Sequence, residues 1–284
     1  MRWAFLPAVS AFALAAAAVA NAAEPAQPAA TAAAGSNLQS PEQVSTRYSA
    51  YTLPARQWSM AAGALGVGDG DVYAVLAITY GLGAGVQLNM NLAHASVGLL
   101  NAGASWHFID TRYFDLKAAL GVWYGHGDWF WIAEPLAKKI LSKIDVVKVP
   151  LELTASSTPN RWLQFDLGLQ YDYARIFGAS SQADSLFTDN QLGLTQVFVR
   201  PGARLFIADN TAFELFARLP FYSAVVGEGS PRTVPFKHTW AVEAGLRSRF
   251  TRGVFGNIRL NYAPVSDLLY GARFYPAFEV EFRP

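Results

Sequence analysis

The sequence predicts an all-β fold, a transmembrane antiparallel up-and-down β-barrel of about twelve strands. Three observations predict it: apolar and polar residues alternate, segments of about ten such residues recur along the chain, and short connections alternate with long ones. The alternation is clearest in residues 162–173, where Leu163 and Phe165 point to one side of a strand and Gln164 and Asp166 to the other. Each predicted strand therefore has one apolar and one polar face.

The strands and their connections predict the topology. We expect strands at residues 57–65, 72–80, 86–93, 99–109, 113–124, 146–155, 162–175, 194–207, 212–222, 236–250, 254–263 and 268–282. The connections at 81–85, 110–112, 156–161, 208–211 and 251–253 are short, and those at 125–145, 176–193 and 223–235 are long. In bacterial single-chain barrels the strand number is even, short turns face the periplasm and longer loops face outward. We therefore expect both termini in the periplasm.

A globular antiparallel sandwich is the alternative fold, because its strands alternate in the same way. Aromatic residues favour the barrel, since they lie at both ends of the outward stripes, as at the two interfaces of a membrane. These residues are Trp58, Tyr80, Phe108, Phe114, Tyr124, Tyr173, Phe213, Phe250, Tyr262 and Phe282. A sandwich has no reason to place aromatics in two such belts.

The N-terminal region predicts export. Residues 1–22 combine a basic start, an alanine-rich apolar stretch and the small-residue site Ala20-Asn21-Ala22, so we expect a signal peptide cleaved after Ala22. An uncleaved membrane anchor is the alternative for this stretch. Residues 23–46 are rich in Ala, Pro, Ser, Gln and Thr without periodicity, which indicates a flexible periplasmic segment. The barrel is expected to occupy residues 47–284.

Composition excludes several classes of function. The chain contains no cysteine, so disulfides, a thiolate metal site and a lipid-modified N-terminal cysteine are excluded. Loss of Arg2 with the signal peptide leaves 22 − 1 = 21 basic residues against 21 acidic ones. This balance gives no electrostatic reason to expect a nucleic acid as partner. No cofactor is predicted.

Two local patterns resemble a known class. The last strand carries an outward stripe of Tyr270, Ala272, Phe274, Phe278, Val280 and Phe282, and residues 78–82 followed by 86–90 form a strand, Tyr-Gly turn, strand unit. Over residues 47–284 the chain resembles bacterial outer-membrane β-barrel proteins, and the turn unit is similar to those of porin-like or transporter-like families. The resemblance implies a location in the outer membrane, contact with its lipid, and recognition by the barrel-assembly machinery. Members usually end on an aromatic residue, whereas Arg283 and Pro284 follow Phe282 here.

The polar faces of the strands should line the lumen and carry any function. The candidate solute-binding residues are Arg200, Arg204, Arg218, Arg247, Arg259, Arg273, Glu152, Asp166, Asp172, Glu214 and Glu243. Arg204 is expected opposite Glu214 across the turn at 208–211. A basic wall facing an acidic patch would favour a channel for small polar or charged solutes. The alternative is a lumen closed by arginine–carboxylate pairs, because unpaired charge in a narrow barrel is costly.

Other functions remain as alternatives. A lipid-modifying enzyme needs a nucleophile, a base and an orienting group, and His94 with Ser96 is the pair closest to this requirement. Because no third member is evident, we predict that the protein is not an enzyme. Residues 68–71 resemble part of a calcium loop but lack its later carboxylate, so a hairpin turn is expected and no metal site is predicted. A plugged structural or adhesive barrel is the third alternative.

The connection at residues 125–145 carries a helical pattern. Apolar residues recur there at spacings of three and four, with lysines between them and three aromatics ahead. The segment is expected to lie on the lipid surface, to fold inward as a constriction, or to pack over the barrel rim.

Overall fold

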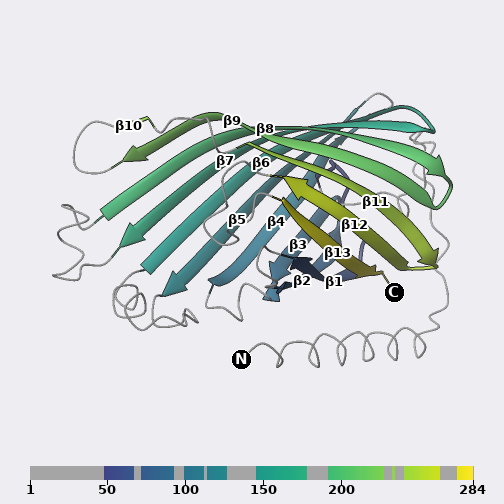
Figure 1. Ribbon diagram of the computed structural model, residues 1–284, viewed down its shortest axis with the longest axis horizontal. Coiled ribbons are helices and arrows are strands. Elements are labelled where there is room, and N and C mark those ends of the chain that lie inside the picture. The colour runs from purple at the N-terminus through teal and green to yellow at the C-terminus, as the bar shows by residue number, and fades with distance from the viewer. Residues whose placement is uncertain are drawn as a thin grey trace.

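The computed structural model describes residues 48–66, 72–92, 99–111, 114–126, 145–177, 191–226, 232–233, 240–262 and 274–283. Within them the strands close into an antiparallel barrel (Figure 1). The signal peptide expected at 1–22, the flexible segment at 23–46 and the helical pattern expected in the connection at 127–144 lie outside the described residues. The described residues contain no helix that is both long and apolar enough to cross a membrane.

The barrel wall consists of twelve strands, as predicted. The strands are β1 (Trp58–Gly66), β2 (Val72–Gly83), β3 (Val86–Asn91), β4 (Leu99–Asp110), β5 (Asp115–His126), β6 (Asp145–Asn160), β7 (Leu163–Phe177), β8 (Gln191–Ala208), β9 (Thr211–Val226), β11 (Ala241–Thr251), β12 (Val254–Tyr262) and β13 (Phe274–Phe282). The two-residue strand β10 (Arg232–Thr233) pairs with β9 outside this ring. The all-β up-and-down barrel is confirmed.

Antiparallel pairing runs around the whole ring. Each strand pairs with its chain neighbour in the wall, and β13 closes the ring by pairing with β1, where Ala62 lies opposite Val280. Closure leaves no wall strand with an open edge, which a membrane requires because lipid satisfies no backbone hydrogen bonds.

The two faces of the wall differ as the alternation predicts. On β7, Phe165, Leu167 and Leu169 are each about half exposed on the outer face, at 49%, 55% and 49%. Gln164 and Asp166 lie between them in sequence, point inward and are buried. Large apolar side chains on the outside and polar ones inside are the arrangement expected of a wall surrounded by lipid.

All short turns lie at one end of the barrel, together with Arg283, whose N–H donates to the Gly253 carbonyl in the β11–β12 turn. The turns join β2 to β3, β4 to β5, β6 to β7, β8 to β9 and β11 to β12. In the β2–β3 turn Gly83, Ala84 and Gly85 all have positive φ, which permits the tight reversal. We call this end the turn end. The strand ends that flank the longer predicted connections lie at the other end.

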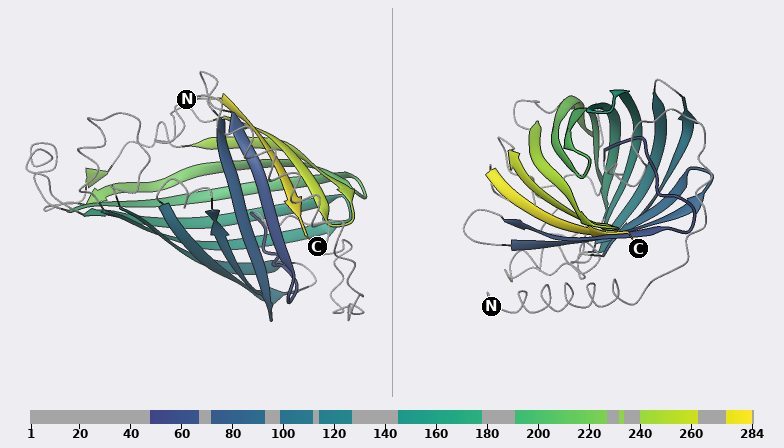
Figure 2. Two further views of the ribbon diagram at one scale, coloured as in Figure 1. Left: turned by 90° about the horizontal axis from the view of Figure 1, so that it is seen from below. Right: turned by 90° about the vertical axis from the view of Figure 1, so that its right-hand side faces the viewer.

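Two details differ from the predicted strands. The segment 156–161 was expected to be a turn, yet β6 continues to Asn160 and Ser156 pairs with Asp166 of β7. Pro159 is accommodated because the pairing shifts register between Ser157 and Asn160. The second difference is one of position: no strand was expected before residue 57, and none forms, but residues 48–57 lie inside the ring of strands, which the sequence did not predict (Figure 2, right panel, in purple). We call residues 48–57 the lumen strap.

Candidate functional site in the barrel lumen

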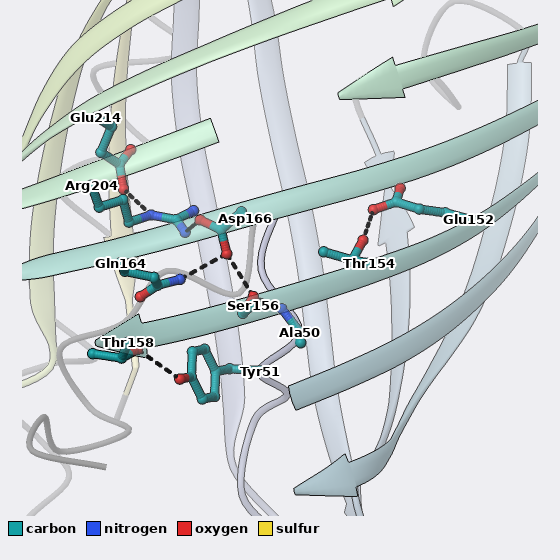
Figure 3. A network of polar contacts seen from close by, with 10 residues as sticks. All are labelled: Ala50, Tyr51, Glu152, Thr154, Ser156, Thr158, Gln164, Asp166, Arg204 and Glu214. Atoms are coloured by element: carbon teal, nitrogen blue, oxygen red, sulfur yellow. Dashed lines mark hydrogen bonds and ion pairs between the residues drawn. The ribbon is translucent and has the colours of Figure 1, made fainter. Parts of the chain in front are cut away.

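A buried polar network joins β6, β7, β8 and β9 on the lumen face (Figure 3). Arg204 forms an ion pair with Asp166, and its Nε lies 2.9 Å from Glu214 Oε1. Ser156 Oγ and Gln164 Nε2 donate to Asp166 Oδ1 at 2.6 and 2.8 Å. Only 1% of the Arg204 and Asp166 side chains is exposed. The predicted Arg204–Glu214 pair is confirmed, and the two residues lie opposite each other in register.

A second set of charges lies on the same strands, farther from the turn end. Arg200 forms an ion pair with Glu152, which also accepts a hydrogen bond from Thr154 Oγ1 at 2.6 Å. This ion pair reaches across β7, which lies between β6 and β8. Gly168 of β7 permits the crossing, since a Cβ there would lie 3.3 Å from Arg200 Nε.

Lys148 and Asp172 form the most exposed ion pair of this region. Lys148 Nζ lies 2.9 Å from Asp172 Oδ2, and 36% of the lysine side chain is exposed. The same ammonium lies 5.6 Å from the centre of the Trp123 ring. Lys148 therefore presents an accessible positive charge to the lumen, whereas Arg200 and Arg204 are buried.

A third network lies next to the first in the ring, on β11, β12, β13 and β1. Glu281 is bound by Arg247 at 2.8 Å, by Arg283 at 2.7 Å and by the Ser59 hydroxyl at 2.7 Å. Arg259 lies 2.8 Å from Glu279 and 3.7 Å from Glu243. These contacts link the strands at which the ring closes.

Aromatic side chains inside the lumen were missed by sequence reasoning. Phe198, Phe216 and Phe255 are buried, and each supports an arginine: Arg218 lies 4.4 Å from the Phe198 ring centre, Arg204 4.8 Å from Phe216 and Arg247 4.5 Å from Phe255. Contact with a ring face stabilises a guanidinium that is partly removed from water. The sequence did indicate that Phe198 faces the lumen, because it lies two residues before the inward-facing Arg200 on the same strand.

The lumen strap runs along the wall from β9 at Tyr48 to β3 at Leu53. The Tyr48 ring packs 5.1 Å from Phe216 of β9, and Arg200 of β8 lies 4.2 Å from the same tyrosine ring. The Ala50 N–H donates to Ser156 Oγ at 2.7 Å on β6, and the Leu53 N–H donates to Gln87 Oε1 at 2.9 Å on β3. The strap therefore follows about half of the inner circumference.

Two further contacts hold the strap near the turn end. The Tyr51 hydroxyl lies 3.3 Å from Thr158 Oγ1, and burial raises the pKa of this phenol above its ordinary value. The Arg56 N–H donates to the Gly81 carbonyl at 2.8 Å. A side chain at Gly81 would overlap the Pro54 carbonyl oxygen and lie 2.6 Å from that of Leu53. The absence of a Cβ at Gly81 is what allows the strap to lie against β2.

The candidate lumen residues divide into groups by their surroundings. Arg200, Arg204, Arg247, Arg259, Glu152, Asp166, Asp172, Glu214 and Glu243 all take part in ion pairs, Arg218 stacks on Phe198, and Arg273 lies outside the described residues. The expected acidic patch does not face a basic wall across the lumen. Its members, Glu152, Asp166 and Asp172, pair with cations one or two strands away, because β6, β7 and β8 are neighbours in the ring.

The four histidines of the sequence divide into two that the structure describes and two that it does not. His107 Nε2 lies 3.3 Å from Asp115, and His126 Nδ1 lies 2.7 Å from Asp145, both at strand ends. His94, Ser96 and His238 lie outside the described residues, as does the Gly-Asp segment at 68–71. Among the side chains that the structure describes, no three His, Asp or Glu residues are grouped as metal ligands.

Comparison with known proteins yields structural likeness alone. No family model and no curated protein matches the sequence. The COG4313 outer membrane channel from Pseudomonas putida F1 is 11% identical, with 85% of this chain and 99% of that chain covered and a TM-score of 0.54. The KdgM porin, solved with disordered oligogalacturonate, is 6% identical with coverage of 80% and 98% and a TM-score of 0.48. The NanC porin is 9% identical, with 79% and 97% covered and a TM-score of 0.46. The fold of this chain is that of the bacterial outer-membrane β-barrels.

Proposed function

We propose that the protein is an outer-membrane channel that passes small polar or charged solutes. One observation carries this proposal: a closed barrel with an apolar outer face has a lumen wall made of charged and polar side chains from β3 to β13. Such a wall hydrates readily, whereas the outer face suits lipid. The protein would lie in the outer membrane with its turn end toward the periplasm.

The pairing of the lumen charges supports weak rather than strong ion selectivity. Arg200, Arg204, Arg247 and Arg259 are each beside a carboxylate, so their fields largely cancel at a distance. Lys148 is also paired, with Asp172, but 36% of its side chain is exposed, so it is the cation best placed to act on passing ions. We therefore assign the selectivity of the channel chiefly to the Lys148 region.

The proposal includes no catalytic step. The two histidines that the structure describes at strand ends both contact aspartates, an arrangement that fixes the ring without supplying a nucleophile. Contact with lipid and assembly by the barrel-assembly machinery belong to the proposal, since the outer face and the closed β13–β1 seam suit both. No nucleic acid and no cofactor take part.

The test is the single-channel conductance of the refolded protein in a planar bilayer under a salt gradient. Stable conductance steps would support the channel, and their absence from a correctly folded barrel would overturn it. Lys148→Gln should shift the reversal potential toward cation preference, because it removes a positive charge and leaves Asp172 uncompensated. Arg161→Gln is the matched control, since it makes the same charge change at an exposed turn outside the lumen.

A further inference from the structure

The lumen strap covers the lumen face of β6 and β7. Gln164, Ser156 and Thr154 are at most 1% exposed although they face the lumen of a barrel that is proposed to hold water. Within the lumen strap, Ser49 and Ala50 are fully buried and Leu53 is 2% exposed. The strap and the wall residues beneath it are therefore packed together without access for water.

The attachments of the lumen strap differ from those of the wall strands. The strap joins no strand ladder, and its hydrogen bonds to β3 and β6 run from single backbone N–H groups to the side chains of Gln87 and Ser156. Residues 48–55 carry no charge, so no ion pair holds this part of the strap. The wall strands are joined by continuous backbone ladders. The strap can therefore detach at far lower cost than any strand of the barrel.

We propose that the lumen strap is a gate: it closes the turn end of the lumen in this conformation, and solutes pass when it leaves the wall. This inference rests on the proposed channel function. The buried network beneath the strap forms its seat, because Ser156 bonds both to the Ala50 N–H and to Asp166, which Arg204 holds in turn. Detachment would expose this polar network to water and leave a charged passage.

A disulfide between the strap and its seat tests the gate directly. The Ala50 nitrogen lies 2.7 Å from Ser156 Oγ. This bounds the separation of the two Cα atoms to about 6.6 Å, within the range that a disulfide spans. In the double variant Ala50→Cys with Ser156→Cys we expect oxidation to abolish channel openings and a reductant to restore them. The natural chain has no cysteine, so it and the two single-cysteine variants are matched controls that should not respond to the oxidant.

A second variant loosens the strap without removing any of its hydrogen-bonding side chains. Gly81→Ala places a methyl group against the Leu53 and Pro54 carbonyls, so the strap must move away from β2. We expect the open probability to rise about fivefold or more, as a modest destabilisation of the closed state produces. Gly121→Ala is the control, because its methyl group would meet the Pro150 side chain of the wall, 2.9 Å away, and not the strap.

The outcomes separate the gate from the channel. If the unmodified protein conducts and the oxidised disulfide variant conducts equally well, the gate is wrong and the channel stands. If openings disappear on oxidation and increase in Gly81→Ala, the gate is supported. If the unmodified, reduced and Gly81→Ala proteins are all silent in a folded state, the channel itself is overturned and the gate with it.

Discussion

Arg204 shows how one lumen residue organises its surroundings. Its guanidinium contacts Asp166 and Glu214 and lies over the Phe216 ring, so a side chain that is 1% exposed has partners on both neighbouring strands, β7 and β9. A buried ion pair of this kind contributes little compared with an apolar alternative, but loss of one partner leaves an uncompensated buried charge. The stability of the lumen wall is therefore sensitive to single substitutions in this network.

Asp166→Asn should be strongly destabilising. It removes one of the two carboxylates that bind Arg204 and weakens the acceptor of Ser156 and Gln164, so we expect a loss of about 2–3 kcal/mol in the free energy of unfolding. Urea-induced unfolding of the protein in lipid vesicles, followed by tryptophan fluorescence, measures this.

Asp172→Asn is the matched control for that prediction. The same chemical change occurs farther along β7, six residues after Asp166. There the partner Lys148 is 36% exposed and can be solvated by water. Here we expect a loss of about 1 kcal/mol or less. Equal losses in the two variants would contradict the role assigned to burial of the Asp166 network.

At the scale of the elements, alternation predicts strands well and predicts irregular segments poorly. The strand at 162–175 was predicted almost to its ends, since period two and a single buried face fix it. The continuation of β6 to Asn160 was missed, because a stretch rich in Ser, Thr and Pro resembles a turn when its pairing partner is unknown. The lumen strap was missed for a similar reason. It has no periodicity, and its position depends on contacts with strands up to about 170 residues away, such as Phe216.

Ala50→Pro should release the strap near its centre. The substitution removes the N–H that donates to Ser156 Oγ, while it changes no residue of the barrel wall. We expect faster amide hydrogen exchange in residues 51–56, by about fivefold or more for a lost hydrogen bond of ~1 kcal/mol. Exchange in the β-ladders should be unchanged.

Ala55→Pro is the control for this variant. Residues 54–57 form a turn in which Gln57 N donates to the Pro54 carbonyl at 3.3 Å and Arg56 has φ of 63°. A positive φ at the third position marks a type II turn, whose second position, here Ala55, accepts proline. Exchange should therefore stay as in the unmodified protein. Equal acceleration in both variants would mean that the Ala50 bond does not anchor the strap.

At the scale of the whole molecule, the barrel could be predicted and the contents of its lumen could not. Twelve strands, the position of the short turns and the apolar outer face all follow from local patterns in the sequence. The partners of the long charged side chains do not, because they depend on stagger and on neighbours two strands apart, as in the Arg200–Glu152 pair across Gly168. The sequence could not decide between a hydrated lumen with opposed charged walls and a lumen of paired charges. The ion pairs seen in the structure decide it.

The orientation of the barrel is a property of the whole molecule and can be tested with single cysteines, since the chain has none. Arg252 is exposed in the turn between β11 and β12, whereas Asp69 falls in the sequence between β1 and β2, whose adjoining ends Gly66 and Val72 lie at the opposite end of the barrel. With the turn end in the periplasm, a maleimide reagent too large to cross the outer membrane should label Asp69→Cys on intact cells. It should label Arg252→Cys only after the outer membrane is permeabilised. Short turns face the periplasm in bacterial barrels because assembly moves the longer loops across the membrane to the outside. The reverse labelling pattern would place the lumen strap at the cell surface, where it would close the channel against the medium instead of against the periplasm.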